Sequence, residues 1–444
     1  MNLVDRLRSR FGEFWWWSLM LFLALRSGDV INAVIGVWIV PRFVVQGELG
    51  AVLPLSGIAA FLGTPIAILV VVFQRYLSRY HALGDEGKKK ALLYGFVGFL
   101  VPAVVAIFAG AYLIMPLFFE RIRVGRGSLG LLIVVGAAVG TIHPVFMNAL
   151  QALRKFRTLT LVNLVCAPVR LVTMVLAMPF YALSGYMLGQ CAGPIVQIML
   201  SAVSLRKETI GTKCERGFWR AEGPGIARYA LKMALYMGFS GLSAAVFALI
   251  IRQRLPEVES AGYYMISRFS EMAIYAGATL SAMMFPFAVA AVTKGEDADA
   301  LLRKTQVGTL VAGIVCVAAL AVLGGPMLRL TAMWRDYAVY APEMTLLAVS
   351  LVCGMLATNR FQFECAADRF GFLWYAVPTY ALQTAFLFVF TGYGYFSGVL
   401  PQSVVDWMAS LKIGTLRNML LVGLATNVAL LAFSQIQVIR RRRT

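Results

Sequence analysis

The chain has 444 residues, of which 60% are apolar and only 14% are charged. Soluble domains contain about 45–50% apolar and about 25% charged residues, so this composition excludes an ordinary soluble protein. It indicates an all-α, polytopic membrane protein, because about 20 consecutive apolar residues cross the hydrocarbon core of a bilayer as a helix.

Apolar runs of this length recur along the whole chain and predict twelve transmembrane helices. We expect them near residues 14–43, 48–80, 90–119, 129–153, 157–181, 183–205, 228–252, 259–291, 301–330, 340–366, 369–396 and 415–439. The most polar stretch follows the sixth helix. It divides the chain into an N-terminal six-helix lobe (1–205), a cytoplasmic linker (206–227) and a C-terminal six-helix lobe (228–444).

The distribution of positive charge predicts the orientation. Most of the 40 Lys and Arg residues fall on segments that lie on the same side of the membrane as the N-terminus. The positive-inside rule therefore places both termini in the cytoplasm, although "ERIRVGRG", between the third and fourth predicted helices, goes against the trend. The formal net charge of +19 is explained as an orientation signal, and no nucleic-acid partner is required.

The first predicted helix carries charges near its midpoint, in the stretch "ALRSGDVIN". An ionised side chain at the centre of a membrane helix costs about 2.5–3.5 kcal/mol on insertion scales. Arg26 and Asp29 are three residues apart, so they share a helix face and can partly neutralise each other. We interpret Arg26 as a candidate substrate-binding residue and Asp29 as a candidate for charge pairing or ion coupling. Asn32 is a further substrate-binding candidate that could hydrogen-bond sugar hydroxyls, and a hydrogen bond to a neighbouring helix explains it equally well.

The same arrangement recurs in the eighth predicted helix. There Arg268 and Glu271 are again three residues apart, and Arg170 is a single cation in the fifth predicted helix, after Pro168. Arg268 and Arg170 join the candidate substrate-binding residues, and Glu271 joins Asp29. Two interpretations stay open: charges that face a hydrated pathway, or ion pairs that only hold helices together.

The tenth predicted helix ends in a different charge pattern. Arg360, Glu364 and Asp368 are spaced four residues apart at its inner end. We interpret this stripe as an interfacial ion-pair ladder, because residues at i and i+4 are neighbours on a helix surface.

Several chemistries lack their sequence signatures. The six cysteines and two histidines show no metal-ligand spacing, and "ALGDEGKKK" lacks the first glycine of a phosphate-binding loop. The outer connections are short and carry no paired carboxylates for glycosyl transfer. We therefore expect no metal, no cofactor and no enzymatic activity.

The second half of the chain repeats the first. "HALGDEGKKKALL" aligns with "AVTKGEDADALLRK", "NALQALRKF" with "QFECAADRF" and "RSGDV" with "FSGLS", all at offsets of 211 to 214 residues. Each repeat holds six helices, an even number, so both have the same orientation. They should pack about an axis along the membrane normal with a cavity between them, an architecture typical of transporters.

Two longer passages resemble a known family. "FLGTPIAILVVVFQRYLSRYHALGDEGKKKALL" and "NALQALRKFRTLTLVNLVCAPVRLVTMVLAMPFYALSGYMLGQCAGPIVQ" are similar to Wzx-type polysaccharide (O-antigen) flippases of the multidrug/oligosaccharidyl-lipid/polysaccharide (MOP) superfamily. The resemblance covers nearly the whole chain in layout, and no short motif in it is diagnostic. It implies two six-helix lobes, with the first and eighth helices lining the gap between them and Arg26 and Arg268 on those helices.

The resemblance also implies a function. Such a flippase moves a polyprenyl-diphosphate-linked glycan from the inner to the outer leaflet of the bacterial inner membrane, for envelope polysaccharide biosynthesis. Its partners would be that glycan, membrane lipid, H⁺ or Na⁺ as a coupling ion, and envelope polymerases or glycosyltransferases. Two alternatives remain open: a multidrug or cation exporter of the MATE type on the same fold, and a membrane scaffold that transports nothing.

Overall fold

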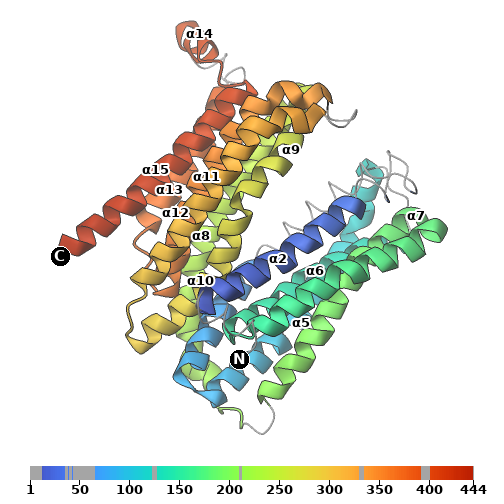
Figure 1. Ribbon diagram of the computed structural model, residues 1–444, viewed down its shortest axis with the longest axis vertical. Coiled ribbons are helices and arrows are strands. Elements are labelled where there is room, and N and C mark those ends of the chain that lie inside the picture. The colour runs from blue at the N-terminus through green and yellow to red at the C-terminus, as the bar shows by residue number, and fades with distance from the viewer. Residues whose placement is uncertain are drawn as a thin grey trace. The chain divides into compact units, whose positions relative to one another are not determined.

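The computed structural model describes residues 13–35, 39, 43, 66–122, 128–209, 213–329, 335–391 and 401–443. Within these ranges every regular element is a helix, as predicted (Figure 1). Besides an unlabelled helix at 66–83, the elements are α2 (Glu13–Val34), α5 (Glu86–Ile122), α6 (Ser128–Ala152), α7 (Phe156–Thr209), α8 (Phe218–Arg254), α9 (Glu257–Ser270), η2 (Glu271–Ile274), α10 (Tyr275–Lys294), α11 (Asp299–Arg329), η3 (Arg335–Tyr340), α12 (Ala341–Ala366), α13 (Leu373–Thr391), α14 (Gln402–Ser410) and α15 (Leu416–Arg443).

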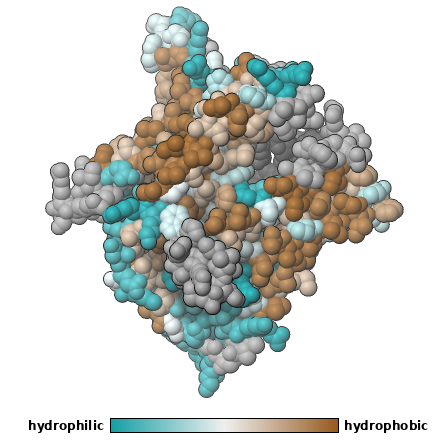
Figure 2. Space-filling view, in the orientation of Figure 1, coloured by the Kyte–Doolittle hydropathy of each residue, from teal (hydrophilic) through white to brown (hydrophobic). Residues whose placement is uncertain are grey.

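The helices have the length and polarity of membrane spans. In the described part of the chain, eight stretches are long and apolar enough to cross a bilayer. Figure 2 shows apolar side chains over much of the visible helix surface, which is the surface expected to face lipid. The prediction of a polytopic, all-helical membrane protein is therefore confirmed.

The chain divides into two compact units. The first comprises Met1–Ala230 with Val289–Glu296, and the second comprises Leu231–Ala288 with Asp297–Thr444. Part of the predicted linker, 206–227, is helical, because α7 ends only at Thr209 and α8 already begins at Phe218.

In the first unit, α7 holds two antiparallel spans, Phe156–Tyr181 and Ser184–Glu208. A Cβ atom added at Gly185 would lie 2.6 Å from the backbone of Ala177, so the two spans touch through their backbones at this point. Gly185, Gly189 and Gly193, at every fourth position in the first part of the second span, keep the two spans close there, as small residues do between membrane helices.

The second unit has its core where α9, α11, α12 and α15 meet. Fully buried apolar side chains from these four helices pack there, among them Ile266, Leu328, Ala348 and Met419. Ser270, at the end of α9, joins this core to α12: its Oγ lies 2.8 Å from the backbone oxygen of Met344.

The internal repeat predicted from the sequence is also visible in the backbone. Gly84 and Gly295, at matching positions of the two repeats, both have positive φ angles of 70° and 73°. Arg154 and Asp368 match in the same way, with φ angles of 53° and 57°. After each of the four residues, the next backbone N–H donates to a carbonyl oxygen five residues back, which is the helix-ending bond of a Schellman motif. The two halves therefore end equivalent helices with equivalent turns.

The structure corrects the eighth predicted helix. The sequence predicts one helix over 259–291, but the 3₁₀ turn η2 separates α9 from α10. In addition, α14 is a short helix that the sequence analysis did not predict; it lies in the connection before α15.

The orientation stays a prediction, and native cysteine chemistry tests it. Of the six cysteines, Cys214 is exposed and the others are buried or partly buried. With cytoplasmic termini, Cys214 faces the cytoplasm and α14 faces outward. A membrane-impermeant maleimide should therefore miss the wild-type protein in intact cells and label it in inside-out vesicles.

A second variant provides the opposite signal. Ser410 is exposed at the end of α14, so Ser410→Cys in a Cys214→Ser background should be labelled in intact cells. The reverse pattern in both experiments would overturn the orientation that the charge distribution predicts.

Candidate substrate site

The Arg26–Asp29 pair predicted on the first helix is present. Arg26 Nη1 lies 2.5 Å from Asp29 Oδ2, and 26% and 48% of the two side chains are exposed. The guanidinium also lies 5.7 Å from the ring centroid of Phe22. Because both charges belong to α2, this contact does not itself tie α2 to another helix.

The pair lies on the helix that packs against α7. A Cβ atom at Gly28 would lie 3.6 Å from the Cβ of Ala167, and Ile35 packs in one cluster with Met174 and Met178 of α7. Arg26 and Asp29 therefore flank the point where α2 contacts the first span of α7.

Arg170 lies one turn beyond that contact, half-buried between the two spans of α7. Its Nη2 is 3.9 Å from Cys166 Sγ on the same helix. Its Nε would be 3.6 Å from a Cβ atom at Gly193, on the opposing span. The absence of a side chain at Gly193 thus leaves room for the guanidinium.

Polar side chains from neighbouring helices surround Arg170. His143, from α6, lies within electrostatic reach of both Arg170 and Gln197. Gln197, on the second span of α7, is 4% exposed and its Nε2 donates to Asn163 Oδ1 at 3.3 Å. We refer to Arg170, His143, Asn163 and Gln197 as the Arg170 cluster. All four residues belong to the first unit.

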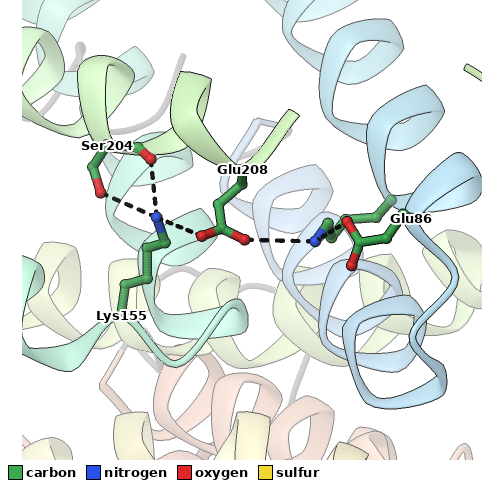
Figure 3. Close-up of polar contacts among 5 residues, drawn as sticks. Glu86, Lys155, Ser204 and Glu208 are labelled. Carbon is green, nitrogen blue, oxygen red and sulfur yellow. Dashed lines mark hydrogen bonds and ion pairs between the residues drawn. The ribbon is translucent and has the colours of Figure 1, made fainter. Parts of the chain in front are cut away.

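Other cations of the first unit are held by carboxylates. Lys155 Nζ lies 2.8 Å from Glu208 and 2.9 Å from the backbone oxygen of Ser204. Lys89, with a side chain only 3% exposed, contacts Glu208 at 3.6 Å and Glu86 still more closely (Figure 3). This chain of ion pairs fastens α5 to the end of α7, so we assign it a structural role.

His81 lies beside that chain of ion pairs, at the end of the helix over 66–83. Burial lowers the pKa of this imidazole, and the positive charges of Lys89 and Arg154 lower it further. His81 is therefore neutral at pH 7 and adds no charge to this end of the unit.

The remaining sequence candidates are in different situations. The side chains of Asn32 and Arg268 lie outside the described residues, so their predicted roles stay predictions. Glu271 is the first residue of η2, is half-buried and lies within electrostatic reach of Tyr263. The predicted acidic residue of the eighth helix thus falls on the break in that helix. A 3₁₀ turn within a helix often marks a functional hinge.

The stripe on α12 is a correction to the sequence analysis. Arg360 Nη2 contacts Glu364 Oε1 at 2.8 Å, but only 10% and 1% of these side chains are exposed. Asp368 instead lies 3.9 Å from Lys232, with both side chains substantially exposed. The predicted interfacial ladder is therefore a buried ion pair followed by a separate surface pair.

The Arg170 cluster was only partly predictable. The sequence singled out Arg170 because an arginine in an apolar run is costly. It gave no reason to connect His143, on another helix, with Arg170, because that proximity depends on how α6 packs against α7.

Comparison with known proteins identifies the fold. No protein-family model and no curated protein matches the sequence. Among solved structures, a point mutant of the Vibrio cholerae MATE transporter VcmN is 15% identical with a TM-score of 0.75 over 99% of this chain and 98% of its own.

Two further structures agree with it. A MOP-superfamily transporter from Pyrococcus furiosus, whose reverse-polarity binding pocket suggests a different function, is 13% identical with a TM-score of 0.74 over 96% and 95% of the two chains. A multidrug-resistance MATE transporter in an outward-facing conformation is 14% identical, also with a TM-score of 0.74, over 97% of each chain. This protein therefore has the fold of the MATE transporters of the MOP superfamily.

Proposed function

We propose that this protein is a transporter that moves an anionic lipid-linked oligosaccharide from the inner to the outer leaflet. The polyprenyl-diphosphate-linked glycans of envelope polysaccharide biosynthesis are the substrate class that fits. Alternating access on the MOP fold would provide the movement. The placement of Arg170 among hydrogen-bonding side chains inside a membrane-embedded unit carries this proposal.

Three features support an anionic substrate. An intramembrane arginine is expensive to insert, so it marks a functional site by default. The guanidinium has a rigid fork of donors that suits phosphate oxygens. The side chains near Arg170 add hydrogen-bonding groups: His143, Asn163 and Gln197. They can donate hydrogen bonds to phosphate or hydroxyl oxygens and accept hydrogen bonds from sugar hydroxyls.

The membrane potential gives such a substrate a driving force. Moving a negative charge outward across an inside-negative membrane releases about 2.3 kcal/mol per 100 mV. A diphosphate headgroup that carries both of its charges outward therefore gains roughly twice that amount. The membrane potential alone can therefore drive transport, with or without coupling to H⁺ or Na⁺.

A cation exporter is the second candidate. Two of the three solved structures described above are MATE transporters, one of them a multidrug-resistance transporter, and Asp29 offers a half-exposed carboxylate on α2. The P. furiosus protein is a reason to weigh pocket polarity on this fold, because there a reversed polarity suggests a different function. The arginine-centred cluster favours the anionic substrate.

Reconstitution in liposomes separates these candidates. The purified protein should move a fluorescent polyprenyl-diphosphate-linked oligosaccharide from the inner to the outer leaflet, detected as a gain of accessibility to an external quencher. An inside-negative potential should speed the outward movement. A fluorescent organic cation, offered with a proton gradient in parallel vesicles, should not move. Movement of the cation alone would establish the exporter, and movement of neither would support the scaffold.

A further inference from the structure

The first unit carries a groove that the proposed transport site does not use. It has a volume of about 410 Å³ and is lined by the helix over 66–83, by α5, by α6 and by the second span of α7. Its walls are largely apolar, with Phe73, Val97 and Phe146 among them.

One end of this groove is basic and aromatic. Arg206, an exposed residue near the end of α7, lies on its rim. Tyr94 lines it with 53% of its surface exposed, and Lys90 Nζ lies 5.7 Å from the Tyr94 ring centroid. Lys90 follows the start of α5 and Arg206 precedes the end of α7, so both cations lie at helix ends.

The other end reaches toward the middle of the membrane span. Gly98 also lines the groove and is eight residues beyond Lys90 on α5. At 1.5 Å per helical residue, this places it about 12 Å deeper along the helix. Both lining stretches, on α5 and α7, belong to candidate membrane spans. The groove thus runs from a basic rim into an apolar interior, which is the polarity of a phospholipid.

We propose that this groove binds one anionic phospholipid of the surrounding leaflet, as a resident lipid and not as transport substrate. An acyl chain would lie along Phe73, Val97 and Gly98. The phosphate would lie near Arg206 and Lys90, beside the Tyr94 ring at the level where tyrosines meet headgroups. Basic residues near a membrane surface attract anionic lipids, which selects this lipid class over a zwitterionic one.

The test compares two lipids on the purified full-length protein in detergent. Phosphatidylglycerol and phosphatidylcholine with identical acyl chains are titrated, and native mass spectrometry counts the lipids retained. We expect one phosphatidylglycerol to bind at least about fivefold more tightly than phosphatidylcholine, since each basic residue contributes about a fivefold preference. Equal retention of the two lipids would overturn the proposal.

Two variants place the lipid in the groove. A Cβ atom at Gly98 meets nothing within 4 Å, so Gly98→Leu should fill the groove without a clash and abolish the tight binding. Gly110→Leu is the matched control, because Gly110 is on the same helix with equally open space and does not line the groove. Arg206→Gln should weaken binding about fivefold, whereas Lys207→Gln, one residue away and also exposed, should not.

Competition identifies the source of the phosphate. Millimolar inorganic phosphate should not displace phosphatidylglycerol, because it lacks the acyl chain that fills the groove. Displacement by inorganic phosphate, or unchanged binding in Gly98→Leu, would overturn the proposal. Displacement by a low concentration of polyprenyl phosphate would assign the groove to the substrate and would also overturn it. Transport is not measured, so the outcome is independent of the proposed function.

Discussion

Replacing Arg170 with glutamine is expected to reduce transport of the polyprenyl-diphosphate-linked glycan about 10- to 100-fold. Hydrogen bonds to a charged partner contribute about 1.5–3 kcal/mol each, and 1.4 kcal/mol corresponds to a factor of ten. Glutamine keeps a polar side chain in the Arg170 cluster but removes the positive charge and the fork of donors. The measurement is the initial rate of flipping in proteoliposomes that contain equal amounts of folded protein.

Two further variants make this result specific. Arg170→Lys should retain intermediate activity, because lysine keeps the charge but loses the bidentate geometry. Arg157→Gln should match the wild type, since Arg157 is an exposed residue at the start of the same helix. Wild-type flipping by Arg170→Gln would remove Arg170 from the substrate site. A loss of folded protein in Arg170→Gln, with normal flipping by what remains, would assign the residue to structure.

The fold could be predicted from the sequence because its signals are local or repeated. Apolar runs about 20 residues long mark spans wherever the solvent is lipid. The repeat offset correctly aligned Gly84 with Gly295, and both residues end a helix with positive φ. Those positions are visible in a sequence because glycine adopts such angles without the steric cost that other residues have.

The break in the eighth helix had no comparable signal. "SRFSEMAIYAG" contains neither proline nor an early glycine, so nothing local predicts η2. Ser270, just before the break, is fully buried, and its hydroxyl lies 2.8 Å from backbone oxygens of both Ile266 and Met344. The contact with Ile266 is local, but the contact with Met344 depends on α12, and Met344 is 74 residues later in the chain. Packing therefore overrides the local helical pattern here.

The sequence predicted which charged residues form pairs better than it predicted how deeply those pairs are buried. Arg26 and Asp29 pair as predicted, because the interaction needs only helical spacing. The same spacing rule found the Arg360–Glu364 contact but placed it at the interface. Spacing along one helix says nothing about which neighbouring helices cover that face, and burial decides how large the energetic effect is.

This burial gives the largest effect on stability that we expect. Replacing Glu364 with glutamine should lower the free energy of unfolding by about 3–5 kcal/mol, the cost of breaking a buried ion pair from one side. The Glu364 side chain is 1% exposed and that of Arg360 is 10% exposed. Water therefore cannot solvate the arginine once the nearby carboxylate has lost its charge. Reversible unfolding in mixed detergent micelles provides the measurement.

The double variant separates the pair from its two members. The free energy of unfolding of the double variant Arg360→Met with Glu364→Leu should be far closer to that of the wild type than the value for Glu364→Gln. A well-packed apolar pair often replaces a buried ion pair at little or no cost.

The surface pair of the same unit is the matched control. Lys232 and Asp368 are 3.9 Å apart, with side chains 39% and 48% exposed. Asp368→Asn should cost no more than about 1 kcal/mol, the usual value of an exposed pair. Asparagine also tolerates the positive φ of 57° at this position. If Glu364→Gln cost no more than Asp368→Asn, the Arg360–Glu364 contact would contribute as a surface pair does, and its burial would have no energetic consequence.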